Sequence, residues 1–365
     1  MVISLVLVAV LCWTAGFWIL FRIPLCHRSS SSAADTKRVS IIIPARNEAH
    51  NLGRLLESIR TQAGRPHETV VVDDNSEDNT AEVARKHGAR VVSCPPLPDG
   101  WLGKPWACRC GAGEAGGDIL LFLDADLFFE PDGLQRLTDV FEKQSGVLSV
   151  APYHVVKKPY ETFSGFFNLM QMVGTGVFAF GNKARARGMF GPCVMIGRGL
   201  YEEVGGHETV KDRVLEHFAL GGVVHRKGAP IELRGGRKSL NTRMYPNGWR
   251  ELIAGWTKSF TIGARETPSR IMIPVNIWIS GINMSIVILI LALLFGTTAE
   301  IAAASGVYLL YAGQITFQFR RLGTFSPFLS IAYPLPLLVF LGVFFSSSYR
   351  RKRRLSAVWK GRKVG

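Results

Sequence analysis

Two aspartates separated by one residue end an apolar run near the middle of the chain. Asp124 and Asp126 close the strand expected over residues 119–124, so both carboxylates can point to the same side of a sheet. Two like charges held close resist ionising together unless a cation compensates them, and hard ions such as Mg²⁺ and Mn²⁺ prefer oxygen ligands. The apolar residues 127–129 favour this interpretation over a solvated strand end. The pair therefore predicts a divalent metal site that holds a phosphate-bearing ligand.

Polar residues also follow the first two expected strands, over residues 39–44 and 68–72. Ligands of an open α/β sheet bind beyond the carboxyl ends of its strands, so these positions are candidates for a nucleotide pocket. One carboxylate could accept hydrogen bonds from a nucleobase, while Ser76 or Asp78 caps the helix that begins at Thr80. The candidate donor-binding residues are Pro44, Arg46, Glu48, Asp73 and Asp74.

Lys104 lies in a stretch, residues 100–110, that combines two glycines with two tryptophans. A mobile loop that carries a lysine suits the capture of a phosphate, with the indoles closing over it. The alternative is a packed surface loop without a ligand. We predict a loop in which Lys104 meets the diphosphate of a nucleotide.

The elements needed to position these residues form an α/β pattern. Short β-branched runs alternate with helix-capable stretches, and the runs are apolar on both faces, as strands of a central parallel sheet are. The second stretch has apolar residues at a helical spacing that ends at Ile59. The expected strands cover residues 39–44, 68–72, 89–93 and 119–124, and the expected helices cover 48–62 and 80–87. The fold class is α/β, with a Rossmann-like domain.

Composition adds a membrane to this picture. The chain has 365 residues, of which 47% are hydrophobic, and a mean hydropathy of +0.17. Lys and Arg (43) minus Asp and Glu (28) give a net charge of +15, and eight of the basic residues lie in residues 347–365 without an acid among them. A basic segment beside an apolar stretch is typical of contact with anionic lipid headgroups. We therefore expect a membrane as partner and no nucleic acid, and the sequence indicates no protein partner.

Uncharged runs cover residues 1–21, 271–299, 301–319 and 322–349, and each is long enough to cross a hydrocarbon core of about 30 Å. The first lacks the basic start and cleavage site of a signal peptide, so we predict an uncleaved anchor. Its basic flank places the following segment in the cytoplasm. A cytoplasmic tail then requires that one later run does not cross. We expect residues 322–349 to form a hairpin at Pro334 and Pro336, with a proline-kinked span as the alternative.

The expected domains follow from these runs, in a multi-pass protein of the cell membrane whose catalytic domain is cytoplasmic. Residues 243–270 are rich in aromatic and basic side chains and predict an amphipathic segment at the membrane surface. The bounds are 1–21 for an N-terminal anchor, 22–38 for a linker, 39–242 for the catalytic domain, 243–270 for the interfacial segment, 271–349 for a membrane region of two or three spans or a hairpin, and 350–365 for a basic tail.

Cysteines and histidines give no metal-ligand spacing in the sequence. We interpret the six cysteines as free thiols in a reducing compartment. His154, His207 and His225 are expected to be structural, because no carboxylate or cysteine accompanies them at ligand spacing.

Several motifs resemble a known family. SIIIPARNE (40–48), VDDNSEDNT (72–80) and LDAD (123–126) resemble the nucleotide-sugar-binding half of family 2 glycosyltransferases with the GT-A fold. GKPWAC (103–108) and EHFALG (216–221) are similar to membrane enzymes of C30 carotenoid synthesis that glycosylate 4,4'-diaponeurosporenoate.

The resemblance implies a role for each matching residue. Pro44, Arg46, Glu48 and Asp74, with Asp73 beside them, would line the uridine pocket of a UDP-sugar. Lys104 would meet the diphosphate, while Asp126 and Asp124 would hold Mg²⁺ or Mn²⁺. Glu216 stands where the family carries Glu-Asp, whose second acid is the usual catalytic base, and this chain has His217 in its place. The candidate catalytic residues are Glu216, His217, Asp126 and Lys104.

The missing acid bears on the acceptor. A hydroxyl acceptor needs a general base, whereas a carboxylic acid is already ionised at neutral pH. We therefore expect an inverting hexosyltransferase that moves glucose to the carboxylate of an apolar C30 apocarotenoid acid. The alternatives are a polyprenyl phosphate, hopanoid or diacylglycerol acceptor, or a non-catalytic membrane protein that binds lipid or nucleotide. The candidate acceptor-binding residues are Trp256, Lys258, Arg243 and Trp249.

Overall fold

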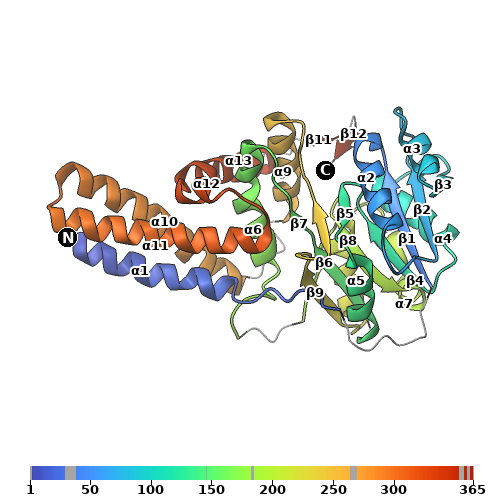
Figure 1. Ribbon diagram of the computed structural model, residues 1–365, viewed down its shortest axis with the longest axis horizontal. Helices are drawn as coiled ribbons and strands as arrows, with labels where there is room; N and C mark the ends of the chain where they lie inside the picture. Colours follow the sequence, from blue (N-terminus) through green and yellow to red (C-terminus); the bar gives the residue numbers. More distant parts are fainter. Residues whose placement is uncertain are drawn as a thin grey trace. The chain divides into compact units, whose positions relative to one another are not determined.

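The computed structural model describes residues 2–28, 38–144, 146–181, 185–263, 269–352, 357–359 and 362–364. The chain forms two compact units (Figure 1). The sheet unit comprises Pro24–Tyr153 and Arg185–Met244, and the helical unit comprises Met1–Ile23, His154–Ala184 and Tyr245–Gly365. The segment His154–Ala184, which we expected inside the catalytic domain, is thus part of the helical unit.

A seven-stranded sheet in the order β3-β2-β1-β4-β8-β6-β9 forms the centre of the sheet unit. Strands β1, β2, β3 and β4 are mutually parallel where they pair, and β8 runs antiparallel to both β4 and β6. The strands are β1 Val39–Ala45, β2 Glu68–Asp73, β3 Arg90–Ser93, β4 Ile119–Leu123, β6 Val147–Ala151, β8 Cys193–Gly197 and β9 Ile231–Gly235. The predicted strands are confirmed to within a residue at their ends, and the sheet is mixed rather than wholly parallel.

Helices cover this sheet and bury their apolar stripes against it. In α2 the buried residues Leu52, Leu55, Leu56 and Ile59 recur at helical spacing, as the sequence predicted. The helices of the sheet unit are α2 Ala49–Arg60, α3 Thr80–Lys86, α4 Gly103–Glu114, α5 Gly133–Glu142, α7 Arg198–Glu203, the 3₁₀ helix η2 Gly206–Val210 and α8 Glu216–Arg226. A smaller sheet contains β5 Leu127–Phe129 and β10 Leu240–Thr242, which pair antiparallel, and β7 Tyr153–His154.

The loop predicted over residues 100–110 is wrong for most of its length. Residue Lys104 lies in the first turn of α4, and the helix continues beyond the expected loop. One glycine just after the expected loop serves packing: a Cβ on Gly111 would lie 2.5 Å from Cγ2 of Ile42 and 2.8 Å from Cγ2 of Val72. Glycine here lets the helix backbone approach the sheet closely, which sequence alone does not distinguish from flexibility.

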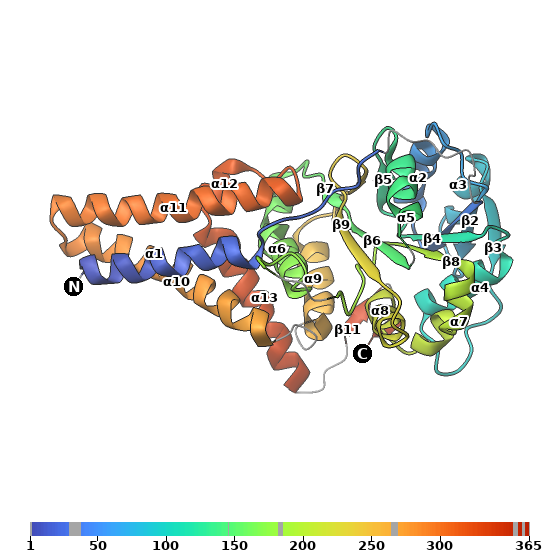
Figure 2. The ribbon, with the colours of Figure 1, turned by 90° about the horizontal axis from the view of Figure 1, so that it is seen from below.

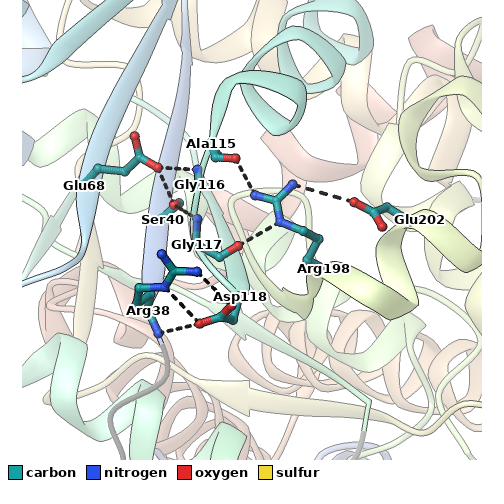
Figure 3. A network of polar contacts seen from close by, with 9 residues as sticks. All are labelled: Arg38, Ser40, Glu68, Ala115, Gly116, Gly117, Asp118, Arg198 and Glu202. Carbon is teal, nitrogen blue, oxygen red and sulfur yellow. Dashed lines mark hydrogen bonds and ion pairs between the residues drawn. The ribbon is translucent and has the colours of Figure 1, made fainter.

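Hydrogen bonds fasten the amino ends of the central strands to the turn before β4 (Figure 3). The buried Ser40 hydroxyl donates to Oε1 of Glu68 (2.7 Å) and accepts from the amide of Gly117 (2.9 Å). The same Glu68 oxygen accepts from the amide of Gly116 (2.6 Å), while Arg198 donates to the Gly117 carbonyl (2.8 Å). This edge of the sheet is thus rigidly cross-linked.

In the helical unit α1, α10 and α11 lie side by side (Figures 1 and 2). Side chains of α11 donate hydrogen bonds to backbone carbonyls of α1 at successive turns. The pairs are Tyr311 to Ala9 (2.8 Å), Gln314 to Trp13 (2.9 Å), Gln318 to Gly16 (2.7 Å) and Arg321 to Leu20 (2.9 Å). We call these four contacts the α1–α11 ladder. Because the residue numbers increase in the same direction along both helices, the two helices run parallel.

The remaining helices pack around a phenylalanine-rich segment. Phe166 and Phe167 of α6 are fully buried. Helix α13 packs against η1, α6 and α9. The elements of this unit are α1 Val2–Ile19, η1 Pro159–Ser164, α6 Gly165–Gly174, α9 Trp249–Gly263, α10 Ser269–Phe295, α11 Thr298–Leu322, α12 Pro327–Ile331, α13 Pro334–Lys352, β11 Ala357–Trp359 and β12 Arg362–Val364.

Among the described residues, one helix, α10, is both long and apolar enough to cross a membrane. Shorter apolar helices cover Ile3–Ile19 and Pro334–Ser347. The run 322–349 is not one continuous helix, because α11 ends at Leu322 and the separate helices α12 and α13 follow. Proline begins both of these helices, at a position where its missing N–H costs no hydrogen bond.

Candidate active site

The carboxyl ends of β1, β2 and β4 meet at one edge of the sheet, and their following loops are tied together. Arg46 donates to the carbonyls of Asp74 (2.8 Å) and Asn75 (3.1 Å). The amide of Asn47 donates to the hydroxyl of Ser76 (3.0 Å). Both Asn47 and Asn75 have φ of 54°, a left-handed conformation that asparagine tolerates better than most residues. The residues of these two loops that the sequence predicts to bind the nucleotide sugar therefore lie next to one another at the carboxyl ends of the strands.

Two of the acids at this edge have local backbone partners. Oδ1 of Asp73 accepts from the amide of Ser76 (3.2 Å), and Oδ1 of Asp78 accepts from the amide of Thr80 (3.0 Å). The predicted capping role is thus confirmed for Asp78, whereas Ser76 fastens the neighbouring loop. Asp74 is buried beside Arg46.

Asp124 and Asp126 flank the turn between β4 and β5. Oδ2 of Asp126 accepts from the hydroxyl of Thr242 (3.1 Å), which the pairing of β10 with β5 brings there. Burial raises the pKa of Asp126 to about 7, and the negative charges of Asp124 and Glu48 act in the same direction. A group of carboxylates that resist ionising together has the donor set and the charge that a hard divalent cation requires. These residues therefore fit Mg²⁺ or Mn²⁺.

Lys104 bridges two acids from different elements. Its Nζ lies 2.6 Å from Oδ1 of Asp124 and 2.7 Å from Oε1 of Glu216, the first residue of α8. Burial alone would lower the pKa of Lys104, but the two carboxylates outweigh it and hold that pKa above its usual value. Burial opposes ionisation of Glu216, whose side chain is 4% exposed, but the positive charge of Lys104 outweighs it and keeps the pKa of Glu216 below the usual value. The site thus holds a charged network next to the proposed metal ligands.

The His217 ring is held by a backbone carbonyl. Its Nδ1 lies 2.5 Å from the carbonyl oxygen of Gly191, so Nδ1 carries the proton and donates it. Burial lowers the pKa of this ring, which is 1% exposed and stands among Phe122 and His207. The neutral imidazole therefore has Nδ1 engaged with Gly191, while Nε2 is buried without a hydrogen-bond partner among the described residues.

The four candidate acceptor residues fall in both units. In the sheet unit Arg243 directly follows β10. Its positive charge acts on Arg54, and the guanidinium of Arg54 lies over the ring of Phe128. Burial lowers the pKa of Arg54, and the positive charge of Arg243 lowers it further. The negative charge of Glu130 acts on Arg54 in the opposite direction.

The other three acceptor candidates lie on α9 of the helical unit. The indole of Trp256 is fully buried, stacks on Phe167 at 4.9 Å and donates to the hydroxyl of Ser164 (3.0 Å). Trp249 is 44% exposed and packs against Phe163. The side chain of Lys258 lies outside the described residues. Trp256 therefore packs as a core residue, and Trp249 is the indole that an acceptor or a membrane could reach.

Comparison with known proteins identifies the family. Residues 40–205 match the sequence family described as glycosyl transferase family 2. The chain is 37% identical over 332 residues to a 4,4'-diaponeurosporenoate glycosyltransferase of Staphylococcus aureus strain USA300, covering 89% of this chain and 88% of that protein. This chain belongs to glycosyltransferase family 2. The corresponding protein of strain MRSA252 is 38% identical, with the same shares covered.

A solved mannosyltransferase structure agrees with the architecture. The mannosyltransferase PcManGT from Pyrobaculum calidifontis, in complex with GDP-Man and Mn²⁺, superposes with a TM-score of 0.52 at 18% identity and covers 91% of this chain and 98% of that one. The predicted α/β GT-A fold is thereby confirmed, with a mixed sheet. In this fold the network around Lys104 lies at the carboxyl edge of the sheet, where nucleotide ligands bind.

Sequence reasoning missed the surroundings of Glu216. We expected His207 to be structural because no cysteine accompanies it at ligand spacing in the sequence, and the fold brings Cys108 of α4, His207 of η2 and His217 of α8 together. Two motifs contained the signal for this cluster. In GKPWAC, Cys108 lies four residues after Lys104, and in EHFALG, His217 directly follows Glu216.

Proposed function

We propose that this family 2 enzyme transfers glucose, with inversion, from UDP-glucose to the carboxylate of an apolar C30 apocarotenoid acid and so forms a glycosyl ester. The observation that carries the proposal is the pair Glu216–His217, in which a neutral histidine bound to Gly191 stands where the family places its acidic base. The name of the Staphylococcus aureus relative supports the same acceptor.

The electrostatics of Glu216 support an acceptor that needs no deprotonation. A general base works best when its pKa is near the working pH, and Lys104 holds the pKa of Glu216 below the usual carboxyl value. Glu216 is therefore a poor base for a hydroxyl group. An acceptor carboxylate is already an anion, so attack forms one bond from its oxygen to the anomeric carbon and breaks the bond from that carbon to the diphosphate, without transfer of a proton.

The residues of the network divide the remaining work. Asp124 and Asp126 would hold the divalent cation, which neutralises charge on the leaving diphosphate when it is bound. The ammonium of Lys104 supplies a second positive charge for that group, and electrostatic stabilisation of this kind is usually the largest contribution to catalysis. Arg243 and Arg54 would hold the acceptor carboxylate.

A membrane topology follows from the directions of three helices. Helices α1 and α11 run parallel, and α10 leads into α11 through the short turn before Thr298. We propose that all three cross the membrane. The end of α1, the start of α10 and the end of α11 then lie on one side, and the basic residues at these ends are Arg22, Arg270, Arg320 and Arg321. The positive-inside rule makes that side cytoplasmic.

The outward surfaces of these helices agree with lipid contact. Large apolar side chains are exposed on each of them, with Leu11 70%, Leu294 65% and Leu309 61% exposed. Helix α13 packs against η1, α6 and α9 rather than completing a further crossing in this proposal. The C-terminal tail then stays in the cytoplasm, as its basic residues require.

The test is a transfer assay on purified protein in detergent with radiolabelled UDP-glucose and a C30 apocarotenoid acid. We expect a coloured, labelled product from which mild base releases the sugar, as it does from an ester. The variant Glu216→Gln should retain much more of its activity on the carboxylate than on an apolar alcohol of the same skeleton. Glu208→Gln, whose side chain is 65% exposed, is the matched control.

Two outcomes would contradict the proposal. A base-stable product would indicate a hydroxyl acceptor such as a hopanoid or diacylglycerol. A loss of carboxylate transfer of about 10² to 10⁴ in Glu216→Gln, the range expected when a general base is removed, would make Glu216 the base.

A further inference from the structure

Three buried side chains with metal-ligating atoms converge behind the catalytic network. Cys108 of α4, His207 of η2 and His217 of α8 each offer one ligand atom, and these atoms all lie within 4.8 Å of one another. Their exposed fractions are 0%, 0% and 1%. We call them the Cys–His–His cluster. Nothing in the proposed transfer reaction uses Cys108 or His207.

Hydrogen bonds fix both imidazoles in one orientation. Nδ1 of His207 lies 2.9 Å from the hydroxyl of Tyr201, and Nδ1 of His217 lies 2.5 Å from the carbonyl oxygen of Gly191. Nε2 of each ring is buried and has no hydrogen-bond partner in the part of the chain that the structure describes. Ligating histidines in proteins show this pattern, with one nitrogen held by an outer oxygen and the other turned to the ion.

A purely structural role does not account for these nitrogens. A buried polar atom without a partner loses its hydration and gains nothing in return, and the described residues include two such atoms in this one cluster. Burial also keeps both rings neutral, by lowering the pKa of His207 and of His217. The neutral form is the one that binds a metal.

We propose that the Cys–His–His cluster binds a borderline-soft divalent cation, Zn²⁺ in particular, through the sulfur of Cys108 and Nε2 of both histidines. Ligand atoms of a tetrahedral zinc site lie roughly 3.3 to 3.5 Å apart. Side-chain rotations that move the ligand atoms by about an ångström would therefore bring them to bonding distance from one ion. The thiol proton leaves to solvent as the sulfur binds. Hard Mg²⁺ is excluded by the sulfur and nitrogen ligands.

The charges around the cluster favour a cation of this valence. Lys104 carries one positive charge, while Asp124 and Glu216 carry one negative charge each, so the network next to the cluster has a net charge of −1. A Zn²⁺ ion with one thiolate has a net charge of +1. The ion with its thiolate therefore has a charge opposite to that of the neighbouring network, so the two attract each other.

The position of the cluster gives the ion a task. Cys108 lies one helical turn after Lys104 on α4, so both side chains share a face, and His217 directly follows Glu216 on α8. An ion bound to Cys108 and His217 therefore fixes the two helices that carry the Lys104–Glu216 pair. It acts as a positioning group and does not touch the substrates.

Metal analysis of the purified full-length protein tests this inference without an activity assay. After removal of loosely bound ions we expect one equivalent of zinc per chain by mass spectrometry. Replacement by Co²⁺ should produce the near-ultraviolet charge-transfer band of a cobalt–thiolate bond. Cys108→Ser should abolish the band and His207→Ala should weaken zinc binding at least tenfold.

Matched variants separate this site from the Asp124–Asp126 site and from misfolding. Asp126→Ala should keep the cobalt–thiolate band, because the carboxylate site has no sulfur. Cys193→Ser removes another buried cysteine of the same unit and should also keep it. Wild-type protein that holds no zinc at micromolar concentration and shows no cobalt–thiolate band would overturn the inference, whatever the variants do. So would a band that survives in Cys108→Ser.

Discussion

The aspartate pair and the lysine show what can be concluded from single residues. Asp124 and Asp126 were assigned from their spacing at a strand end, and the structure surrounds them with the charges of Glu48 and Lys104. Two acids close together at the end of a strand could be predicted, because the apolar run defines the strand that ends there, and their role as metal ligands stays a prediction. The partners of Lys104 were not predictable, because Glu216 is distant in sequence and reaches it only through the fold.

Arg243 provides a prediction at the residue scale. Its guanidinium and that of Arg54 would hold the acceptor carboxylate, so Arg243→Ala should raise the KM for a carboxylate acceptor roughly tenfold or more, as expected for loss of a charge-assisted hydrogen bond. The KM for UDP-glucose should stay unchanged. Steady-state kinetics with both substrates varied would measure this.

The control is Arg60→Ala, which removes an exposed guanidinium from the same helix as Arg54. Equal effects of the two variants, or a KM change for the donor alone, would assign Arg243 to another task.

At the scale of elements, the strands and the amphipathic helices could be predicted and helix α4 could not. Alternation of apolar runs determined β1, β2 and β4, because a parallel sheet buries both faces of its strands. Helix α4 was mistaken for a loop because its glycines and Pro105 resemble turn signals. Its stability comes from tertiary packing of Gly111 on Ile42 and Val72, which local sequence does not contain.

Glu68 gives a pH prediction for the cross-linked edge of the sheet (Figure 3). Burial opposes its ionisation, but the Gly116 amide, the Ser40 hydroxyl and Arg90 outweigh this and lower its folded-state pKa. A carboxyl group with a lowered folded-state pKa stabilises the fold above its unfolded-state pKa, about 4.3, and that stability is lost as the pH falls through the folded-state value.

We therefore expect Glu68→Gln to reduce the free energy of unfolding by about 1 to 3 kcal/mol at pH 7 and to reduce its pH dependence below about pH 4.5. Denaturant titrations between pH 3 and pH 7 measure both effects. Glu57→Gln, at an exposed ion pair, should change little. If the free energy of unfolding of Glu68→Gln depends on pH as that of the wild type does, this carboxylate does not cause the pH dependence.

Gly16 provides a test of helix packing. A Cβ at this position would collide with the indole nitrogen of Trp278 and with the side-chain amide of Gln314. Gly16→Ala should therefore lower the free energy of unfolding of the detergent-solubilised protein by about 1 to 3 kcal/mol, although alanine has the better helix propensity. In Gly306→Ala on α11, where the added Cβ meets nothing within 4 Å, stability should be equal or higher.

The whole molecule divides the work between two units. The sheet unit carries every residue that we assign to the donor, and the helical unit carries the apolar surfaces. The sequence predicted this division from its uncharged runs. It did not predict that His154–Ala184 joins the helical unit, because a short apolar helix inside a catalytic segment looks like part of that domain's core.

The proposed topology is testable by reporter fusions. Alkaline phosphatase inserted after Gly296 should be active, because the turn between α10 and α11 would lie outside the cytoplasm, whereas a fluorescent protein at the C-terminus should fluoresce. An active phosphatase fused after Lys352 would show that α13 crosses the membrane. A phosphatase inserted in the turn after Lys86, in the sheet unit, is the cytoplasmic control and should be inactive.

The α1–α11 ladder has a consequence for the way the protein is made. Its bonds join residues some 302 positions apart, as between Gln318 and Gly16. At a synthesis rate of about 5 to 20 residues per second, α1 emerges from the ribosome roughly 15 to 60 seconds before its partner exists. A peptidase that clipped α1 during this interval would leave Tyr311, Gln314 and Gln318 without acceptors in a lipid environment. The helices α1 and α11 can therefore assemble only if α1 stays uncleaved until α11 has been made. A nascent chain arrested before α11 should be degraded.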